Sequence, residues 1–160
     1  TINDFPAYGD VSGWSTDKVR EMYSMFYGCV ELKELELGDW TTSSLLGECQ
    51  GYRQGNPKVY CSYDGWIETA WDGNKGLGFM FCNCKLLKEL DLGNFDTTNV
   101  KDVSNMFWGD TTLTKIYLNN FSSTSITTYE DMFKNVKSTC TIYTNSTFKT
   151  WINCSPCELG

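Results

Sequence analysis

The sequence predicts an α/β solenoid in which coils of about 26 residues stack on one another, each with a short helix and a short parallel strand. Trp14, Trp40 and Trp66 are 26 residues apart, and Phe95 and Phe121 continue the series after steps of 29 and 26 residues. The motif LKELxL also occurs twice, at 32–37 and 87–92. Such a period is typical of repeats that bury their apolar faces against their neighbours. We therefore expect about five coils.

Length and charge restrict the class of protein. The chain has 160 residues, which fits one domain, so we expect residues 1–160 to form a single solenoid. Its formal net charge of −7 argues against nucleic acid as a partner, because phosphates require basic patches. There is no apolar run of the roughly 18 residues that a membrane span requires, and no apolar segment typical of a signal peptide at the start. We expect no membrane span.

The first regular unit covers residues 14–45. Apolar residues at helical spacing predict a short helix in its first half. This stripe consists of Val19, Met22, Met25 and Phe26. The segment 32–37 then alternates apolar and charged residues, which is the pattern of a half-buried strand. Trp40 follows at the turn.

The pattern returns over residues 79–143. Two further helical stripes are expected, one of Val100, Val103, Met106 and Phe107, the other of Ile126, Tyr129, Met132 and Phe133. Strands are expected at 87–92, 113–118 and 141–143. Threonines before the helices are expected to act as N-caps, namely Thr16, Thr97 and Thr98.

The two ends and the middle of the chain depart from the repeat. Residues 1–13 and 144–160 are expected to be caps, since the last coils of a solenoid otherwise expose apolar faces. Residues 46–78 form either a degenerate coil or an inserted loop. The degenerate coil is favoured, because Trp66 keeps the aromatic period and 60–63 falls where a strand is due. Glu48 and Gly51 oppose it, since they stand where methionines should fill the helix.

The segments 14–45 and 79–133 resemble the BspA-like leucine-rich repeat family, also called the mycoplasma-lipoprotein-type surface repeat. The matching residues are M25-F-Y-G-C-29, the LxxLxL strands and the W/F-x-T tails, as at Trp40 and Phe95. The resemblance implies a right-handed leucine-rich-repeat-like solenoid. It also implies a surface or secreted protein concerned with adhesion, and it transfers no ligand residues.

Cysteine usage suggests an oxidising compartment. The chain has eight cysteines and no histidine, and an even count of thiols suits disulfides better than metal binding. The disulfide candidates are Cys29, Cys49, Cys61, Cys82, Cys84, Cys140, Cys154 and Cys157. Cys49–Cys61 is the preferred pair within 46–78. A Cys29–Cys84 bond is expected only if residues 46–78 loop out, since adjacent coils are within disulfide reach and coils two apart are not.

N-x-S/T sequons provide mild further support for secretion, and we expect an extracellular or cell-surface location. The candidate glycosylation sites are Asn120, Asn145 and Asn153.

The outward face of the strands is the candidate binding face, because the sheet surface of a solenoid is its usual interaction surface. Stacking in register places two rows of residues on this face. One row is expected to contain Glu34, Tyr60, Glu89 and Lys115, and the other Glu36, Ser62, Asp91 and Tyr117. A basic protein surface, a sugar or a cation would suit acidic groups among tyrosines, although a merely solvated strand face is the simpler interpretation.

Nothing in the motifs predicts catalysis. The chain has no histidine, no phosphate-binding glycine loop and no HExxH, and we expect no cofactor, no metal and no enzyme activity. We therefore expect a non-catalytic adhesion or binding protein with a protein or glycan partner. One alternative is a structural subunit that binds copies of itself in an extracellular filament. A glycan-active enzyme using paired carboxylates is a minor alternative.

Overall fold

The computed structural model describes residues 8–19, 22–43, 45, 60–63, 66–69, 76–152 and 157–159, with the backbone alone at 60–63, 66–69 and 157–159. The elements in chain order are β1 (Tyr8–Asp10), β2 (Glu34–Glu36), β3 (Tyr60–Tyr63), β4 (Trp66–Thr69), β5 (Glu89–Asp91), β6 (Lys115–Leu118), β7 (Thr141–Thr144), α1 (Ser146–Ile152) and β8 (Cys157–Leu159).

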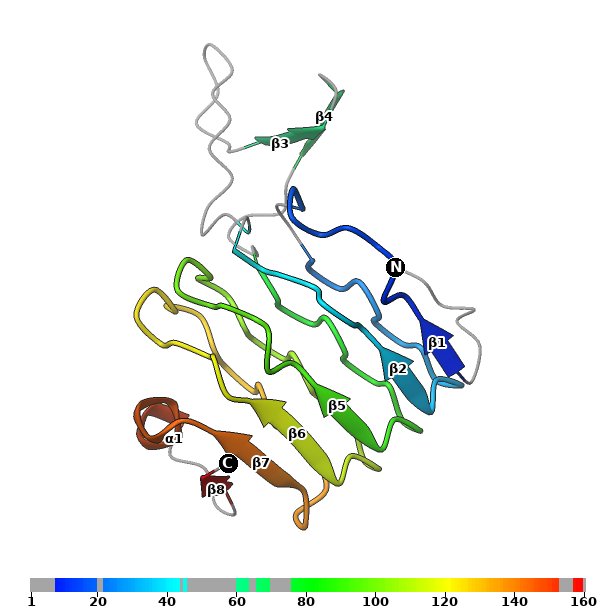
Figure 1. Ribbon diagram of the computed structural model, residues 1–160, viewed down its shortest axis with the longest axis vertical. Coiled ribbons are helices and arrows are strands. Elements are labelled where there is room, and N and C mark those ends of the chain that lie inside the picture. The colour runs from blue at the N-terminus through cyan, green and yellow to red at the C-terminus, as the bar shows by residue number, and fades with distance from the viewer. Residues whose placement is uncertain are drawn as a thin grey trace.

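Short parallel strands form one side of a stack of coils (Figure 1). β1 pairs with β2, with Gly9 opposite Leu35. β5, β6, β7 and β8 form a second parallel sheet in that order. The strands expected at 32–37, 87–92, 113–118 and 141–143 are thus confirmed as β2, β5, β6 and β7. Their alternate residues, such as Leu90 and Ile116, point into the core.

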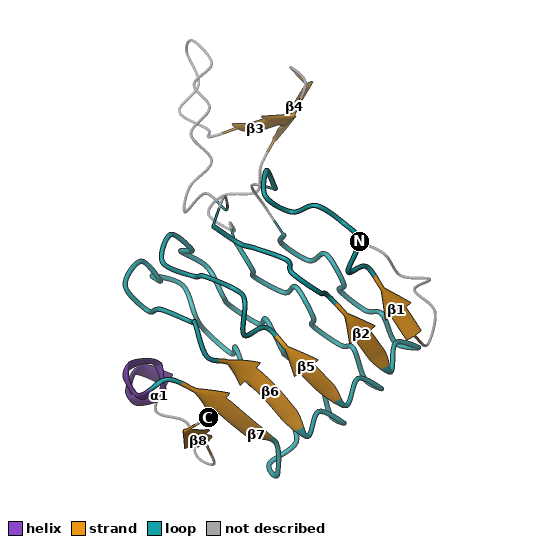
Figure 2. Ribbon diagram, viewed as in Figure 1, coloured by secondary structure: helices purple, strands orange, loops and turns teal. Residues whose placement is uncertain are grey.

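The helices expected in the first half of each coil are not present in the described residues, where these segments form consecutive turns (Figure 2). Ser24, Asn105 and Asp131 have φ angles of 56°, 54° and 57° and therefore cannot continue a right-handed helix. The backbone donates to the neighbouring coil instead. The N–H of Phe26 donates to the oxygen of Met80 at 2.8 Å, for example. The apolar stripes are real, but they belong to stacked turns.

Stacked phenylalanines occupy the centre of these turns. The rings of Phe26, Phe81, Phe107 and Phe133 follow one another at centroid distances of 5.5, 6.0 and 5.4 Å, with interplanar angles of 7°, 2° and 12°. The first three rings are completely buried. This column shows the register directly, because each ring lies on the equivalent ring of the next coil.

The same register defines four coils. We number them coil 1 (22–45), coil 2 (76–100), coil 3 (101–126) and coil 4 (127–152). Equivalent turn hydrogen bonds close three of them, from the N–H of Leu45, Val100 and Ile126 to the oxygens of Thr42, Thr97 and Ser123.

Coil 1 is hydrogen-bonded directly to coil 2. The N–H groups of Met22, Ser24 and Gly28 donate to the oxygens of Gly76, Gly78 and Cys82 at 2.8–3.1 Å. These bonds leave no place for another coil between them, so the degenerate-coil interpretation of 46–78 is wrong. Residues 46–75 are an insertion between Leu45 and Gly76, and residues 76–78 belong to coil 2.

The hairpin formed by β3 and β4 lies in this insertion. β3 pairs with β4 in antiparallel register, with Tyr63 opposite Trp66. The parallel strand expected at 60–63 is therefore not part of the coil stack. Trp66 does not extend the aromatic series, and its 26-residue spacing from Trp40 is coincidental.

The aromatic series at the turns after the strands is otherwise confirmed in part. Trp14 stacks on Trp40 at 6.0 Å, and Phe121 packs edge-on against Phe148 at 5.4 Å. Trp40, Phe95, Phe121 and Phe148 are all buried. The Nε1–H of Trp40 donates to the oxygen of Val11 at 2.8 Å, which satisfies its buried polar atom.

Threonines in the tails bridge coils where N-caps were expected. The hydroxyl of Thr16 donates to the oxygen of Thr41 at 3.1 Å and accepts from the N–H of Thr41 at 2.9 Å. Thr97 makes the equivalent pair of bonds with Ser122. Both threonines are buried. Thr98 is exposed and bonds to Asp96.

The expected N-terminal cap at 1–13 contains β1, a strand of the stack. At the other end, α1 lies within the expected cap at 144–160. The side chains of Phe148 and Trp151 pack together at 5.2 Å, and Trp151 also contacts Tyr129 of coil 4. α1 lies at this end of the stack (Figure 1), with Phe148 in the buried core and Trp151 and Ile152 packed against it.

Two carboxyl groups are completely buried in the stack. Asp110 accepts a hydrogen bond from the N–H of Cys84 at 2.8 Å through Oδ1, and Asp102 accepts one from the N–H of Ser104 at 2.8 Å. Within the described part of the chain, no hydrogen bond reaches the second oxygen of either group. Burial raises the pKa of Asp110 to about 9, so this side chain is neutral at pH 7.

The phenylalanine column predicts a large effect of truncation. Phe107→Ala removes a ring with buried rings on both sides, and we expect it to lower the free energy of unfolding by about 3–5 kcal/mol. Equilibrium unfolding in urea measures this change. Val30→Ala is the control, since Val30 is 43% exposed, and it should change stability by less than about 1 kcal/mol. Equal losses in the two variants would contradict the proposed importance of the column.

The insertion predicts a tolerated deletion. Residues 46–75 occupy the place that the single residue Lys101 takes between Val100 and Asp102. Replacing 46–75 with Gly-Ser-Gly should therefore leave one cooperative thermal transition, because the described backbone bonds from coil 1 to coil 2 join residues outside the insertion. A matched replacement of 101–126 should abolish cooperative unfolding, because it removes a whole coil. Loss of the transition in the first variant would show that the insertion is part of the core.

Burial of Asp110 predicts that stability depends on pH. Its folded-state pKa of about 9 lies above the ordinary value of 3.8, so the folded state holds an extra proton between these values. The free energy of unfolding should therefore fall as pH rises from about 4 to about 9. Asp110→Asn, which keeps the acceptor for Cys84, should flatten this dependence and be more stable than the parent at pH 8. Denaturant titrations at several pH values measure both, with exposed Glu31→Gln as the control. An unchanged slope in Asp110→Asn would contradict the assignment.

Candidate functional site

The outward residues of the parallel strands form one continuous surface, which we call the strand face. It consists of Tyr8 and Asp10 on β1, Glu34 and Glu36 on β2, Glu89 and Asp91 on β5, Lys115 and Tyr117 on β6, and Thr141 and Tyr143 on β7. The inward residues between them, such as Leu35 and Leu90, are buried, which fixes the orientation of the outward ones. The strand face is the candidate functional site.

The structure brings together six of the eight residues expected on this face. Glu89 lies opposite Lys115, and Asp91 lies opposite Tyr117, in the order that the sequence predicts. Tyr60 and Ser62 were expected between β2 and β5, but they belong to β3 of the hairpin. Their predicted place in the rows is wrong, because coil 1 meets coil 2 directly.

β1 provides two residues of the strand face that sequence reasoning missed. Tyr8 pairs with Glu34 and Asp10 with Glu36 in the parallel register. The sequence gives a weak signal, since Y8-G-D-10 has the outward–inward–outward pattern of E34-L-E-36 but no leucine at its centre.

Negative charge concentrates on β1, β2 and β5. Asp10, Glu34, Glu36, Glu89 and Asp91 are all exposed carboxylates on these strands. Loss of hydration raises the pKa of the Tyr8 hydroxyl, and the neighbouring carboxylates Asp10, Glu36 and Glu34 raise it further. This shift shows that Tyr8 lies in a negative field.

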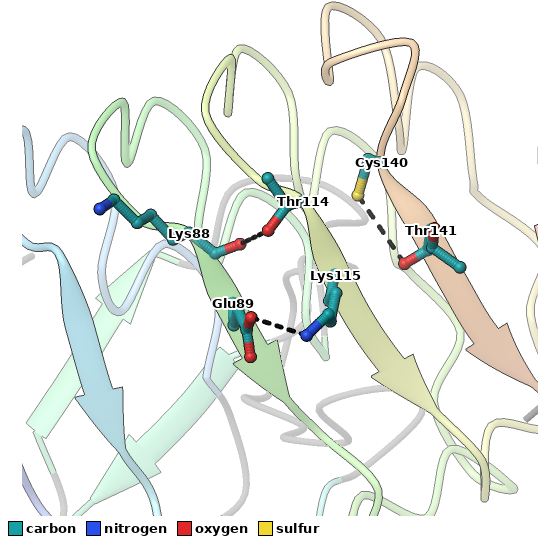
Figure 3. A network of polar contacts seen from close by, with 6 residues as sticks. All are labelled: Lys88, Glu89, Thr114, Lys115, Cys140 and Thr141. Atoms are coloured by element: carbon teal, nitrogen blue, oxygen red, sulfur yellow. Dashed lines mark hydrogen bonds and ion pairs between the residues drawn. The ribbon is translucent and has the colours of Figure 1, made fainter.

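Lys115 is the cation of the strand face. Its Nζ lies 3.0 Å from Oε1 of Glu89 on the adjacent strand (Figure 3). This hydrogen bond raises the pKa of Lys115, and the charge of Glu89 adds to the effect. Both side chains are about half exposed, so the pair contributes little to stability. The remaining four carboxylates make no ion pair with the described residues.

A pair of tyrosines continues the face on β6 and β7. The rings of Tyr117 and Tyr143 stack at a centroid distance of 4.8 Å with an interplanar angle of 11°. Both are partly exposed. The strand face therefore changes from acidic to aromatic along the stack.

A groove of about 510 Å³ opens between coils 1 and 2 at the ends of their strands. β2 and β5 belong to different sheets, so no ladder of backbone bonds closes the face there. The groove is lined by Glu36, Asp91 and Tyr117 of the strand face and by the aromatic residues Trp40 and Phe95. It combines negative charge with apolar walls.

A series of asparagines, which we call the asparagine column, bridges the coils and was also missed; its member Asn94 lines the groove. The side-chain amides of Asn94, Asn120 and Asn145 donate to the oxygens of Gly38, Gly93 and Asn119 in the preceding coils, at 3.3, 2.5 and 3.0 Å. The sequence could have indicated this column, because each of these asparagines follows shortly after a predicted strand.

Two of the candidate glycosylation sites belong to this column. Asn145 also donates to the oxygen of Phe121 at 2.8 Å and accepts from the N–H of Phe148 at 2.9 Å, as the N-cap of α1. A glycan attached to Nδ2 of Asn145 would leave that nitrogen one hydrogen, whereas the fold uses two for the bonds to Asn119 and Phe121. Asn120 is exposed and donates one bond. Asn153 lies outside the described residues.

The four cysteines whose side chains the structure describes do not belong to the strand face. Cys29, Cys82, Cys84 and Cys140 are buried in the coils. Cys61 lies in β3 and Cys157 in β8, whereas Cys49 and Cys154 lie outside the described residues. No group of three or more metal-ligating side chains gathers in the described part of the chain.

Among the described residues, no helix has both the length and the apolar character to cross a bilayer.

The comparison with curated proteins gave no match, and neither did the comparison with solved structures. One family model matches residues 3–52 and 70–152, and the unmatched residues between them fall within the insertion. Since these segments make up more than half of the chain, this protein belongs to the family described as "Mycoplasma protein of unknown function, DUF285".

Proposed function

We propose that this protein is a non-catalytic binding protein whose strand face contacts a lysine- and arginine-rich surface of a protein partner. The observation that carries the proposal is the cluster of five exposed carboxylates on β1, β2 and β5 with a stacked tyrosine pair beside it. Complementary charge steers such a partner and sets its orientation.

The spacing of the carboxylates suits a basic protein segment. Paired strands lie about 4.8 Å apart, so Asp10 and Glu36 on β1 and β2 present charges at an interval that successive cationic side chains reach. Lys115 neutralises Glu89 alone. The other four carboxylates are available to a partner.

The tyrosine pair and the groove add affinity that charge alone does not provide. A guanidinium or ammonium group stacks on an aromatic face at a gain of about 0.5–2 kcal/mol. Tyr117 lines the groove together with Glu36 and Asp91, so one cationic side chain would contact a ring and two carboxylates. A sugar partner would use the same tyrosines but would gain little from the acidic groups.

Two wider features support a location outside the cell. We propose that the stack of coils is a right-handed BspA-like leucine-rich-repeat solenoid and that the protein acts as an extracellular or cell-surface adhesin. Eight cysteines in 160 residues support an oxidising compartment. The resemblance of coils 1 to 3 to the BspA-like repeat supports a role in adhesion, by analogy with that family.

The filament alternative has less support. Head-to-tail assembly requires an exposed apolar interior at both ends of the stack. At the end formed by coil 4, Phe148 of α1 packs against Phe121 and Trp151.

The proposal predicts that one charge reversal on the strand face weakens binding. Glu36→Lys should reduce affinity for arginine- and lysine-rich peptides about tenfold, because it places like charges together. Tyr117→Ala should also weaken binding, because it removes the cation–π contact and one wall of the groove. Binding of the parent should weaken as salt rises. Isothermal titration calorimetry measures each affinity, with acidic peptides of equal length as negative controls.

Glu31→Lys is the matched control for Glu36→Lys. It makes the same change of net charge at an exposed position in a turn, away from the strand face. We expect it to retain most of the affinity. If both variants lost the same affinity, the loss would come from the change in net charge and not from the strand face. If the parent protein bound no basic peptide, the proposal would be refuted.

A further inference from the structure

Cys29 and Cys84 occupy equivalent positions in coils 1 and 2. The ring of Phe26 lies on that of Phe81, and the same step along the chain leads from Cys29 to Cys84. The nearby bond from the N–H of Gly28 to the oxygen of Cys82, 2.8 Å long, fixes this register. Equivalent residues of adjacent, hydrogen-bonded segments have Cα atoms about 5 Å apart, within the range that a disulfide spans.

The two thiols are in contact. The side chains of Cys29 and Cys84 are hydrogen-bond partners. The Sγ of Cys84 also donates to the backbone oxygen of Phe26 at 3.1 Å, which holds it against coil 1. Both residues are completely buried.

The other buried cysteines of the described coils have no cysteine in register. The equivalents of Cys82 are Tyr27 in coil 1 and Trp108 in coil 3, and Cys140 lies opposite Thr114. Burial raises the pKa of Cys82 and that of Cys140 to about 11, which keeps these two thiols protonated. Cys29 and Cys84 differ from these two, because the hydrogen bond between their side chains lowers the pKa of Cys29 and raises that of Cys84.

We propose that Cys29 and Cys84 form a disulfide that clamps coil 1 to coil 2 across the insertion. The bond would close residues 30–83 into a loop that contains the whole of 46–75. It would join coil 1 to coil 2 at positions that each come five residues before a strand, β2 after Cys29 and β5 after Cys84. This inference does not depend on what the strand face binds.

A low-molecular-weight disulfide, such as oxidised glutathione, is the oxidant. The Cys29 thiolate attacks one sulfur of glutathione disulfide, forms a mixed disulfide and releases one glutathione thiolate. The Cys84 thiolate then attacks the Cys29 sulfur, which forms the protein disulfide and releases the second glutathione. The two protein thiols lose their protons and two electrons, and two molecules of reduced glutathione result. Because both thiols are buried in the folded protein, the reaction takes place during folding.

Peptide mapping after oxidative refolding tests the proposal. The full chain with Cys82→Ala is unfolded, reduced and refolded with reduced and oxidised glutathione, and remaining thiols are alkylated. Trypsin cleavage after Arg20, Lys33, Lys75 and Lys85 isolates Cys29 in 21–33 and Cys84 in 76–85. We expect these two peptides as one disulfide-linked species that reductant separates. Recovery of both with alkylated cysteines, or linked to other peptides, would overturn the proposal.

Thermal unfolding provides an independent test. Reductant should lower the unfolding midpoint of the Cys82→Ala protein by on the order of 10 °C more than that of the Cys29→Ala protein. The two variants are matched, since each removes one buried thiol from the same pair of coils. An equal response to reductant in both would contradict a stabilising Cys29–Cys84 bond.

Discussion

Backbone hydrogen bonds between successive coils fix the register on which the rest of this molecule depends. They run along the turn segments, as from Phe26 to Met80 and from Phe81 to Met106, as well as along the strands. Each bond places a residue over its equivalent in the next coil. The phenylalanine column and the rows of the strand face both follow from that single constraint. The net gain per bond is about 1 kcal/mol, but the bonds are satisfied together or lost together.

The register also explains how the chain carries a large insertion. Only Lys101 separates Val100 of coil 2 from Asp102 of coil 3, whereas residues 46–75 separate the equivalent residues Leu45 and Gly76, and coils 1 and 2 are still hydrogen-bonded to each other. Gly76 allows the return, since its φ of 117° suits glycine and a Cβ there would lie 2.9 Å from the Val100 side chain. Beyond this point the coils resume their bonds. The strand face continues across the junction, where the groove opens because β2 and β5 do not pair.

Equivalent positions of the four coils are not always occupied by the same kind of residue. One such position contains polar side chains in the core. Cys29, Cys84, Asp110 and Val136 are equivalent residues of the four coils. Asp110 is neutral there and accepts the N–H of Cys84, which also donates to the oxygen of Phe81. The buried column thus contains a hydrogen-bonded pair of thiols next to a protonated carboxyl. The strand face, by contrast, keeps its charges in water, where they serve recognition at little cost to stability.

The sequence by itself determined the repeat, the four regular strands and the outward orientation of Glu34, Glu36, Glu89, Asp91, Lys115 and Tyr117. Hydrophobic periodicity is sufficient for these, because a strand with leucine at alternate positions can bury only one face. Only the tertiary structure decided that the apolar stripes form stacked turns, that 46–75 is an insertion and that Tyr60 and Ser62 lie off the strand face. Apolar spacing does not reveal whether a backbone N–H bonds within its own segment or to the next coil. That choice depends on contacts with residues far away in the chain, as when Cys29 meets Cys84.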